Sequence, residues 1–365
     1  MSPIKVGVVG LSSTGWAASA LAPGLLNAPS FSLTAVSTTS AASAEASAKK
    51  YSALAGHPVK SFHGDASGIA NDKDVDLVAV SVKASAQKAV ALAVIAAGKD
   101  VFIEWPAGAN AQDTAEIAAA AKAKGVKSLV GLQGRQAPSI KKVKEILESG
   151  VIGKVRSSSI IALCASEINM WGPKISERSI YATDVNGGAT WLNIGVGHLF
   201  DAVTYLLGDL TTVSATTAQH YPIVMVLDDE QKPTGKTVNA SAPDQIAFNG
   251  LFKSGAISSA IFRAGLPATK GRKHFLWEID GEEGSIRMES DELAAPFINV
   301  QDPKVYLNGE LVEFEPVTSP ATNLTSAWEA FAKGEAYPTL EDALKTRRLL
   351  EGIKQSAQEG RVVNL

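Results

Sequence analysis

The chain has 365 residues, which is enough for two packed domains that each hold a hydrophobic core. Its net charge of −3 comes from 34 basic and 37 acidic residues without a long block of either sign, which argues against direct partners such as nucleic acid or an anionic membrane. The single cysteine, Cys164, excludes an internal disulfide, and the N-terminus does not resemble a signal peptide. We therefore expect a soluble, cytoplasmic protein.

Short β-rich runs alternate with helical stretches over the first third of the chain. Strands are expected at residues 4–9, 31–36, 76–81, 101–103 and 128–132. Helices are expected between them, at residues 41–54, 88–98 and 113–124. Gly98 and Gly125 end two of these helices just before a strand. This alternation is typical of βαβ units and predicts an α/β protein whose residues 1–133 form a Rossmann domain with a parallel sheet.

The pattern changes after residue 133. One amphipathic helix is expected from Pro138 to Ser149, followed by strands at 155–163, 211–217, 244–253, 256–262, 275–279 and 285–288. These predict a second domain, residues 134–365, with a large, open, mostly antiparallel sheet for substrate binding and dimerisation. A last helix at 340–356 is expected to pack back on the first domain. We also expect a homodimer or higher homo-oligomer, because an open sheet with a bare apolar face usually finds a partner.

A Gly-rich segment lies between the first strand and the first helix, where a dinucleotide fingerprint belongs. Its residues are Gly10, Leu11, Ser12, Ser13, Thr14 and Gly15. Ser12 replaces the middle glycine, which normally lets the backbone approach the pyrophosphate. The segment predicts nucleotide binding. The alternative is a helix N-cap made by Ser12 or Ser13 without any ligand.

The end of the second strand bears on which nucleotide binds. It reads Ser37-Thr38-Thr39-Ser40, without the acidic residue that would bond a ribose 2′-hydroxyl and repel a 2′-phosphate. Hydroxyl groups can donate to a phosphate, so Ser37 and Thr38 favour NADP over NAD as the cofactor. A plain polar turn is the alternative.

Other cofactor contacts are expected where strands end. These residues are Trp16, Ser81, Lys83, Glu104, Trp105 and Arg135. Trp105 either stacks on the nicotinamide or fills a wall of the site, and Trp16 can equally be a packing residue. For Arg135, a pyrophosphate or carboxylate contact competes with a structural ion pair.

Three stretches together resemble the Gfo/Idh/MocA oxidoreductase family. They are Glu104-Trp105-Pro106, the helix from Lys144 to Gly150 with Ile152-Gly153, and the segment from Gly187 to Asp201. The resemblance covers nearly the whole chain. It implies a Rossmann domain followed by an α/β domain with a large open sheet, and an NAD(P)-dependent reaction on sugars, polyols or related carbonyl compounds.

Other phrases are similar to a subgroup of this family, the fungal galactose/lactose metabolism regulatory proteins. They are Gly10-Leu11, Gly15-Trp16-Ala17, Glu104-Trp105 and Leu132-Gln133-Gly134-Arg135. This subgroup binds NAD(P) and acts on a protein partner without catalysis. The resemblance therefore implies an alternative function for this chain, as a regulator that binds a protein partner and is nucleo-cytoplasmic.

The family's catalytic positions are altered in this chain. Trp105 stands where the family's proton-donating lysine is expected, and an indole cannot exchange a proton at accessible pH. Ile194 and Ala86 stand where the resemblance implies an aspartate and a histidine, whereas His198 is retained. Loss of a positioned general acid costs about 10²–10⁴-fold in rate. An enzyme with this sequence therefore needs a substitute acid.

Several residues could supply that acid. Lys83 follows a strand of the first domain, Tyr181 precedes the Gly-rich segment at 187–188, and Asp184 could polarise Tyr181 or His198. Lys174 is a further candidate. Each also has a structural reading, as a solvated lysine, a packing tyrosine or a core histidine. The scattered histidines and the lone cysteine make no complete metal-ligand set, so no metal is expected. Two functions remain, an NAD(P)-dependent oxidoreductase and a non-catalytic NAD(P)-binding regulator, and base rates within the family favour the enzyme.

Overall fold

A computed structural model describes residues 2–317 and 319–365, and within it the chain forms two compact units. The first unit holds the residues up to Gln136 together with a later segment that ends at Leu344. The second unit holds Ala137–Val317 and Lys345–Leu365. The first unit thus combines the N-terminal residues with a segment from the C-terminal region. No described helix combines the length and the apolar character that a membrane span requires.

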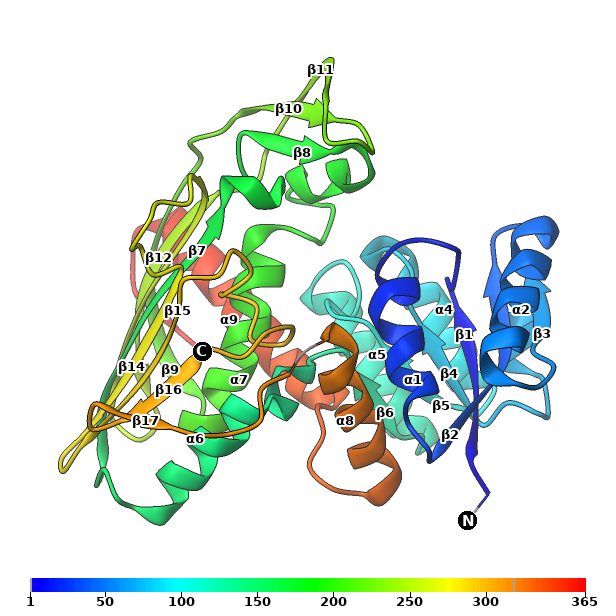
Figure 1. The fold of residues 1–365 in the computed structure, drawn as a ribbon, viewed down its shortest axis with the longest axis horizontal. Helices are drawn as coiled ribbons and strands as arrows, with labels where there is room; N and C mark the ends of the chain where they lie inside the picture. The colour runs from blue at the N-terminus through cyan, green and yellow to red at the C-terminus, as the bar shows by residue number, and fades with distance from the viewer. Residues whose placement is uncertain (1, 318) are drawn as a thin grey trace. The chain divides into compact units, whose positions relative to one another are not determined.

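The first unit is built on a six-stranded sheet with the order β3-β2-β1-β4-β5-β6 (Figure 1). All of its strand pairs are parallel, as the alternating pattern predicted. The strands are β1 (Ile4–Val9), β2 (Phe31–Thr38), β3 (Lys60–His63), β4 (Leu77–Val80), β5 (Asp100–Ile103) and β6 (Ser128–Val130). The strand order reverses between β1 and β4, with β2 and β3 on one side and β5 and β6 on the other. Parallel sheets of this kind bind nucleotides at such a point.

Local sequence signals set the helices of this unit. The Ser40 side chain accepts a hydrogen bond from the Ser43 N–H and caps α2 (Ala41–Ala55), and Asn110 caps α5 (Ala111–Lys124) in the same way through the Asp113 N–H. The remaining segments are η1 (Ala17–Leu21), α1 (Ala22–Leu26), α3 (Ser67–Ala70), α4 (Ala84–Ala96) and η2 (Gln133–Gln136). Helix α5 ends at Gly125 in the left-handed conformation, as expected for a C-terminal glycine.

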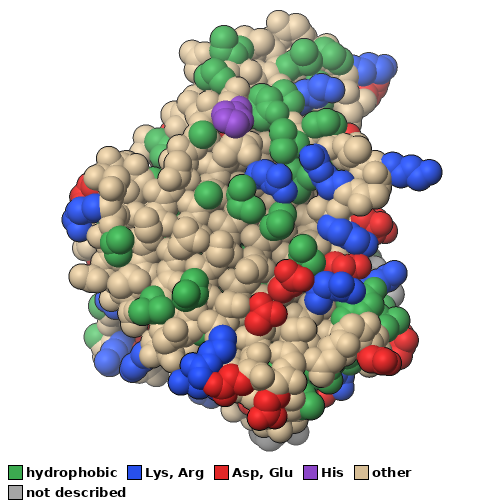
Figure 2. All heavy atoms as spheres, turned by 90° about the vertical axis from the view of Figure 1, so that its left-hand side faces the viewer, with side chains coloured by type: hydrophobic (Ala, Val, Ile, Leu, Met, Phe, Trp, Pro, Cys, Tyr) green, Lys and Arg blue, Asp and Glu red, His purple; other side chains and the backbone are tan. Residues whose placement is uncertain are grey.

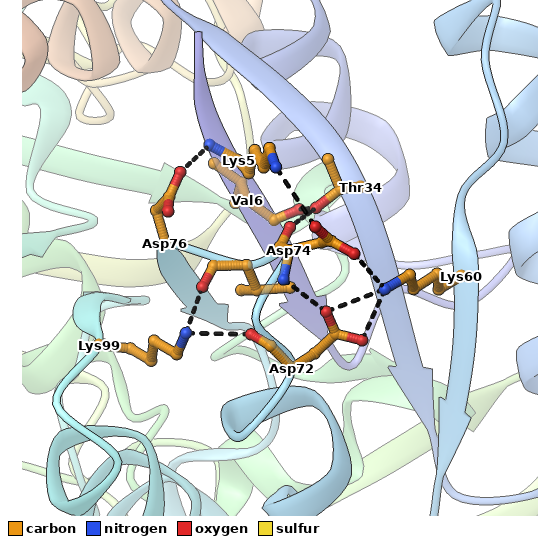
Figure 3. A network of polar contacts seen from close by, with 9 residues as sticks. Lys5, Val6, Thr34, Lys60, Asp72, Asp74, Asp76 and Lys99 are labelled. Atoms are coloured by element: carbon orange, nitrogen blue, oxygen red, sulfur yellow. Dashed lines mark hydrogen bonds and ion pairs between the residues drawn. The ribbon is translucent and has the colours of Figure 1, made fainter. Parts of the chain in front are cut away.

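Ion pairs join the amino-terminal ends of the strands (Figure 3). The Lys60 ammonium lies 2.9 Å from a carboxylate oxygen of Asp72 and 2.8 Å from one of Asp74. Lys5 pairs with Asp74 at 3.4 Å, and Lys99 donates to the carbonyl oxygens of Asp72 and Val75. These contacts join the starts of β1, β3, β4 and β5, at the edge opposite the carboxyl ends of the strands.

The helix that packs on this sheet from the C-terminal region is α8 (Pro320–Lys333). Its Trp328 stacks on Phe102 of β5, with ring centroids 4.9 Å apart, and meets Phe31 of β2 edge-on at 5.0 Å. The start of α9 (Leu340–Glu359), up to Leu344, also belongs to the first unit. Leu324, Trp328 and Phe331 share one helical face, which explains the burial of α8.

The second unit is built on a nine-stranded sheet with the order β17-β16-β15-β14-β7-β13-β12-β9-β18. The β7–β13 pair is parallel and the other pairs are antiparallel, as expected for a mostly antiparallel sheet. The strands are β7 (Val155–Ala165), β9 (Leu210–Ala218), β12 (Gln245–Phe252), β13 (Ile257–Leu266), β14 (Phe275–Gly281), β15 (Ser285–Ser290), β16 (Lys304–Leu307), β17 (Glu310–Val312) and β18 (Val363–Asn364). The predicted fold class is confirmed.

Helices cover one face of this sheet and leave the other exposed. Helix α7 (Gly197–Leu207) packs against α6 (Pro138–Ser149), and its Phe200 contacts Phe248 of β12 at a centroid distance of 4.8 Å. On the opposite face, Ala247, Ile261, Ile161 and Leu276 form one row across four paired strands. Figure 2 shows this outer face, with apolar side chains scattered among uncharged polar ones.

A small three-stranded sheet, β11-β10-β8, was not expected from the sequence. It consists of β8 (Lys174–Ser176), β10 (Ile223–Leu227) and β11 (Pro233–Asn239). The 3-10 segments η3 (Ser166–Ile168) and η4 (Glu177–Thr183) flank β8, and the π-helical turn η5 (Leu192–Val196) leads into α7. Strand β11 is mostly exposed and polar, so no hydrophobic pattern marks it.

Candidate cofactor site and polar groups of the second unit

The Gly-rich turn after β1 packs directly against the ends of two neighbouring strands. Gly10 has a φ of +93°, and a side chain there would place its Cβ 2.2 Å from the carbonyl oxygen of Ser81, which follows β4. The Gly10 N–H donates to the Ser37 carbonyl oxygen of β2 at 2.8 Å. Only glycine fits this position. Three strand ends therefore meet where the strand order reverses, which is the geometry that a nucleotide-binding turn requires.

Ser12 and Ser13 do not cap the helix that follows this turn. The Ser12 hydroxyl donates to the Thr14 carbonyl oxygen at 3.0 Å, and η1 begins without a side-chain cap hydrogen bond. The N–H groups of Ala18 and Ser19 bond instead to the Gly15 carbonyl oxygen at 3.1 and 3.0 Å. The capping alternative is therefore wrong. Ser13, Thr14 and Gly15 are exposed, so the turn presents its backbone to solvent ahead of a helix.

The hydroxyl groups at the end of β2 have different environments. Ser37 is 1% exposed, and its Oγ has no hydrogen-bond partner among the described residues. The Thr38 hydroxyl donates to the Ser40 carbonyl oxygen at 3.2 Å. Ser40 caps α2, and Thr39 is exposed. The end of the strand thus holds one enclosed hydroxyl that lacks a partner, which is an energetic cost unless a ligand or water completes it.

A hydrogen bond joins the Gly-rich turn to the end of β5. The indole Nε1 of Trp16 donates to Oε1 of Glu104 at 3.0 Å. Trp16 is 38% exposed, whereas Glu104 is 8% exposed. The sequence prediction named both residues as cofactor contacts but not their pairing, because they lie 88 positions apart. The bond fixes the direction of the Trp16 ring beside the turn.

Burial of Glu104 changes its acid–base behaviour. Removal of the carboxyl from water raises its pKa from 4.5 to about 8, while hydrogen bonds from the Trp16 side chain and the Trp105 backbone act in the opposite direction. On its other side, a Cβ at Gly131 would lie 2.4 Å from Glu104 Oε2, so that glycine makes room for the carboxyl. Glu104 is therefore largely neutral near pH 7.

Trp105 lies in the wall of the sheet's carboxyl edge and is 6% exposed. The neighbouring loops are joined by Gln87 of α4, whose amide nitrogen donates to the carbonyl oxygens of Val82 at 3.2 Å and Glu104 at 3.3 Å. Its amide oxygen accepts from the Gly108 N–H at 2.7 Å. The sequence analysis missed Gln87, and no motif marks it. It holds the Glu104-Trp105 segment in place.

Two expected cationic contacts have different surroundings. Lys83 lies at the start of α4, after the end of β4, and it is exposed at the carboxyl edge of the sheet. Arg135 forms an ion pair with Asp342 of α9 at 3.2 Å. Burial raises the pKa of Asp342, but the Arg135 charge and hydrogen bonds from Thr339 outweigh burial and lower it overall. The structure thus contains the structural ion pair that was one of the two alternatives for Arg135.

In the second unit, Tyr181 and Asp184 belong to one tightly folded loop. The Asp184 carboxylate accepts from the Asn186 N–H at 2.9 Å and from the Ser241 hydroxyl at 3.5 Å. A Cβ at Gly187 would lie 2.0 Å from the Tyr181 carbonyl oxygen, so only glycine closes the loop. Tyr181 is 38% exposed, and burial raises the pKa of its phenol. These contacts make Asp184 a turn-stabilising group.

His198 lies at the start of α7, directly after η5. Burial lowers the pKa of its ring from 6.5 to about 4, and its Nδ1 is enclosed without a hydrogen-bond partner among the described residues. The ring is therefore neutral near pH 7. In the preceding segment η5, the Asn193 amide donates to the Gly188 carbonyl oxygen at 3.0 Å and holds the Gly-rich segment against η5. A ligand or a water molecule could supply the partner that this enclosed nitrogen lacks.

Each unit gathers part of the expected site. The first unit brings together the Gly-rich turn, Ser37, Ser81, Trp16 and Glu104. In the second unit, Tyr181 and Asp184 lie in the loop that Gly187 closes, and His198 follows η5 at the start of α7, without a hydrogen bond that joins it to either residue among the described contacts. Across the described residues, no group of three or more His, Cys, Asp or Glu side chains is arranged to hold a metal ion. These features define a two-unit protein with a dinucleotide-binding Rossmann fold.

Comparisons with known proteins agree with that class. The family described as "Oxidoreductase family, NAD-binding Rossmann fold" matches residues 4–132, and "Gal80p, C-terminal domain" matches residues 138–290. Dehydrogenase aclE of Aspergillus oryzae is 32% identical over 336 residues, which are 90% of this chain and 88% of that protein. The galactose/lactose metabolism regulatory protein GAL80 of Saccharomyces cerevisiae is 25% identical over 324 residues, 84% of this chain and 71% of that protein.

Solved structures share the fold over the full length. A super-repressor mutant of Gal80p from Saccharomyces cerevisiae superposes with a TM-score of 0.89 at 22% identity, and covers 100% of this chain and 98% of its own. Levoglucosan dehydrogenase in complex with NADH and L-sorbose gives a TM-score of 0.79 at 19% identity, with 100% and 99% covered. The chain belongs to the Gfo/Idh/MocA family of oxidoreductases with an NAD-binding Rossmann fold, which includes both dehydrogenases and Gal80-type regulators.

Proposed function

We propose that this protein is an NAD(P)-dependent oxidoreductase that acts on a carbonyl or alcohol group of a sugar-like compound or a secondary metabolite. The observation that carries the proposal is the relationship to a fungal dehydrogenase, 32% identical over 90% of this chain. The structural likeness to a dehydrogenase that binds NADH and L-sorbose supports a sugar-like substrate. Cys164, buried and without a disulfide, fits the reducing cytoplasm as the site of action.

The carboxyl edge of the six-stranded sheet is proposed to hold the cofactor. The Gly-rich turn would accept the pyrophosphate, since Gly10 lets the backbone approach closely and Ser13, Thr14 and Gly15 are exposed. Lys83, which follows β4, and Trp16, which directly follows the turn, lie at the same edge. A bound nicotinamide ring would supply or take up the hydride, and the residues of the chain would orient the substrate and move the proton.

The end of β2 supports NADP as the preferred nucleotide. Ser37 and Thr38 carry hydroxyls, and no acidic side chain occurs in residues 37–40 to repel a 2′-phosphate. We expect Thr39→Asp, at an exposed position, to weaken NADPH binding by about tenfold or more, because a carboxylate then faces the phosphate. Thr39→Asn, which adds no charge, is the matched control. Titration of both variants with NADPH and NADH checks this, and an equal loss for both nucleotides would contradict it.

The second unit is proposed to supply the proton that Trp105 cannot. Reduction of a carbonyl adds a hydride to carbon and a proton to oxygen. Burial raises the pKa of Tyr181, so its phenol keeps its proton near pH 7 and can donate it, with the proton later replaced from solvent. His198 is neutral at this pH and can orient the substrate oxygen by a hydrogen bond without transferring a proton.

Turnover of NADPH and NADH by the purified protein in a metabolite extract, followed by mass spectrometry, tests the proposal. We expect protein-dependent oxidation, and a loss of about 10²–10⁴-fold in Tyr181→Phe, which lacks only the hydroxyl. His198→Asn should also reduce turnover, whereas His220→Gln, at an exposed position of the same unit, serves as the control. Full activity in both Tyr181→Phe and His198→Asn would reject this assignment.

A non-catalytic regulator is the second candidate, and Trp105 is the observation that favours it. An indole replaces the expected acid at the end of β5, in a chain whose residues 138–290 match the C-terminal domain of Gal80p. This candidate predicts tight nucleotide binding without turnover in any extract fraction. It also predicts a protein partner whose binding responds to the nucleotide. Turnover that depends on Tyr181 would exclude it.

The outer face of the nine-stranded sheet supports a homodimer or higher homo-oligomer. Ile257 is 59% exposed, Leu251 40% and Ile261 37%, and all three lie on paired strands. A row of apolar side chains of this kind on an otherwise small and polar sheet face fits a second copy of the same face. Light scattering after gel filtration should give at least twice the chain mass, and Ile261→Asp should lower it.

A further inference from the structure

Glu104 has an unusual position for a carboxyl group in this fold. It follows β5, yet its Oε1 accepts a hydrogen bond at 3.0 Å from Trp16, which follows β1. The end of β4 lies between these two strands in the sheet. The carboxyl therefore reaches across the point where the strand order reverses, which is the part of such a sheet that faces a nucleotide.

The position of Glu104 also indicates which half of the nucleotide lies nearest. In this fold the adenosine ribose is bound at the end of β2, so the adenosine half lies over the β1, β2 and β3 side. The nicotinamide half then lies over the β4, β5 and β6 side, where Glu104 is found. This step rests on the proposed cofactor site described above.

The charge of Glu104 is held in balance by opposing interactions. Burial disfavours the carboxylate, whereas the N–H donors of Trp16 and Trp105 favour it, and the resulting pKa is about 8. No charged side chain is among the causes of this shift. On the segments around it, α4 contributes the neutral Gln87, Lys83 is exposed, and Arg135 is paired with Asp342. One positive charge placed beside the carboxyl would therefore change its ionisation.

We propose that Glu104 makes the protein distinguish the oxidised from the reduced cofactor by charge. The oxidised nicotinamide ring is a cation, and the reduced ring is neutral. Binding of the oxidised nucleotide stabilises the Glu104 carboxylate and releases its proton to solvent, whereas binding of the reduced nucleotide leaves the proton in place. The oxidised nucleotide consequently binds more tightly as the pH rises, and the ratio of the two affinities depends on pH.

Calorimetric titration of the full chain with NADP⁺ and NADPH from pH 6 to pH 9 tests this, in two buffers of different ionisation enthalpy. Between these limits the affinity for NADP⁺ should rise about tenfold relative to that for NADPH, which corresponds to a pKa change of one unit. At pH 7 a pKa change of one unit should release about 0.4 of a proton per NADP⁺ bound and none with NADPH. Titration of the 2′-phosphate affects both nucleotides alike, so their difference isolates the effect of Glu104.

Two variants identify the group responsible. Glu104→Gln keeps an oxygen acceptor for Trp16 but cannot ionise, so the proton release and the pH-dependent difference should disappear, whereas Glu335→Gln, in an exposed turn of the same unit, should retain both. Trp16→Phe removes the donor that favours the carboxylate, so the midpoint of the pH dependence should move upward. If Glu104→Gln does not fold, the shift in Trp16→Phe decides.

The outcomes separate this inference from the proposed function. Absence of nucleotide binding at every pH would overturn both. Binding with the same pH dependence for NADP⁺ and NADPH, or proton release that persists in Glu104→Gln, would overturn the role of Glu104 and leave the cofactor site standing. An unchanged midpoint in Trp16→Phe would also count against the proposed balance.

Discussion

The two edges of the six-stranded sheet carry polar groups of opposite character. At the amino-terminal edge, Lys60 binds both Asp72 and Asp74, and hydrogen bonds with these carboxylates raise the pKa of its ammonium (Figure 3). At the carboxyl edge, the Ser37 hydroxyl is enclosed without a described partner and burial keeps Glu104 largely neutral. The first edge is satisfied by the chain itself. The second holds groups at a cost, as expected where a ligand completes the site.

The largest effect on the free energy of unfolding is expected at Gly10, where backbone segments pack closely at the carboxyl edge of the sheet. Gly10→Ala would force a Cβ to within 2.2 Å of the Ser81 carbonyl oxygen at a φ of +93°, so we expect a loss of about 3 kcal/mol or more in the free energy of unfolding. Gly15→Ala is the matched control, because its φ of +87° is similar but no atom lies within 4 Å, and about 1 kcal/mol is expected. Urea unfolding of both variants checks the difference, and equal losses would show that close packing at Gly10 is unimportant.

An intermediate effect on the free energy of unfolding is expected from the buried carboxyl group of Glu104. The pKa of Glu104 is about 8 in the folded chain, above the ordinary value of 4.5, so the folded state holds more protons between these values. The free energy of unfolding should therefore fall as the pH rises through this window, by up to about 1.4 kcal/mol per pH unit from this group. Glu104→Gln should remove that fall and be the more stable protein at pH 8. Parallel pH profiles of the unfolding midpoint in the two proteins would refute it.

The smallest effect is expected at the amino-terminal edge. Lys60→Met removes exposed ion pairs with Asp72 and Asp74, which are screened by solvent and salt. The unfolding midpoint should fall by less than in either case above, the difference should fade at high salt, and NADPH affinity should stay unchanged. A change in nucleotide affinity in this variant would show that the two edges are coupled.

Helices and strands that are marked by neighbouring residues in the sequence could be predicted with nearly correct bounds. Helix α6 begins at Pro138 and ends at Ser149, as its periodic apolar face and terminal glycine predicted. Five of the six parallel strands of the first unit and six of the strands of the second were also found, since each is a short apolar or alternating run with a turn signal beside it. The tight turn at Gly10 could be predicted for the same reason, because it depends on the adjacent strand and helix. The mostly exposed strand β3 was not predicted.

Elements held by distant partners could not be predicted in this way. Strand β11, from Pro233 to Asn239, is polar and exposed, and its pairing with β10 defines it. The apolar face of α8 is visible in the sequence at Leu324, Trp328 and Phe331, but nothing local indicates which sheet buries it. The same holds for Arg135, whose pairing with Asp342 depends on the fold of the first unit.

Local chain chemistry therefore determined the α/β class, the Rossmann unit and the Gly-rich turn, because steric preference and hydrophobic period act over a few neighbouring residues. Tertiary structure alone decided that Trp16 donates to Glu104, that Gln87 holds the end of β5, and that His198 is enclosed and neutral. These properties arise from burial and from hydrogen bonds between segments far apart in the chain. Burial changes the pKa of a side chain without changing its identity. A glutamate is therefore an ordinary acid on the surface but a largely neutral carboxyl group at the end of β5.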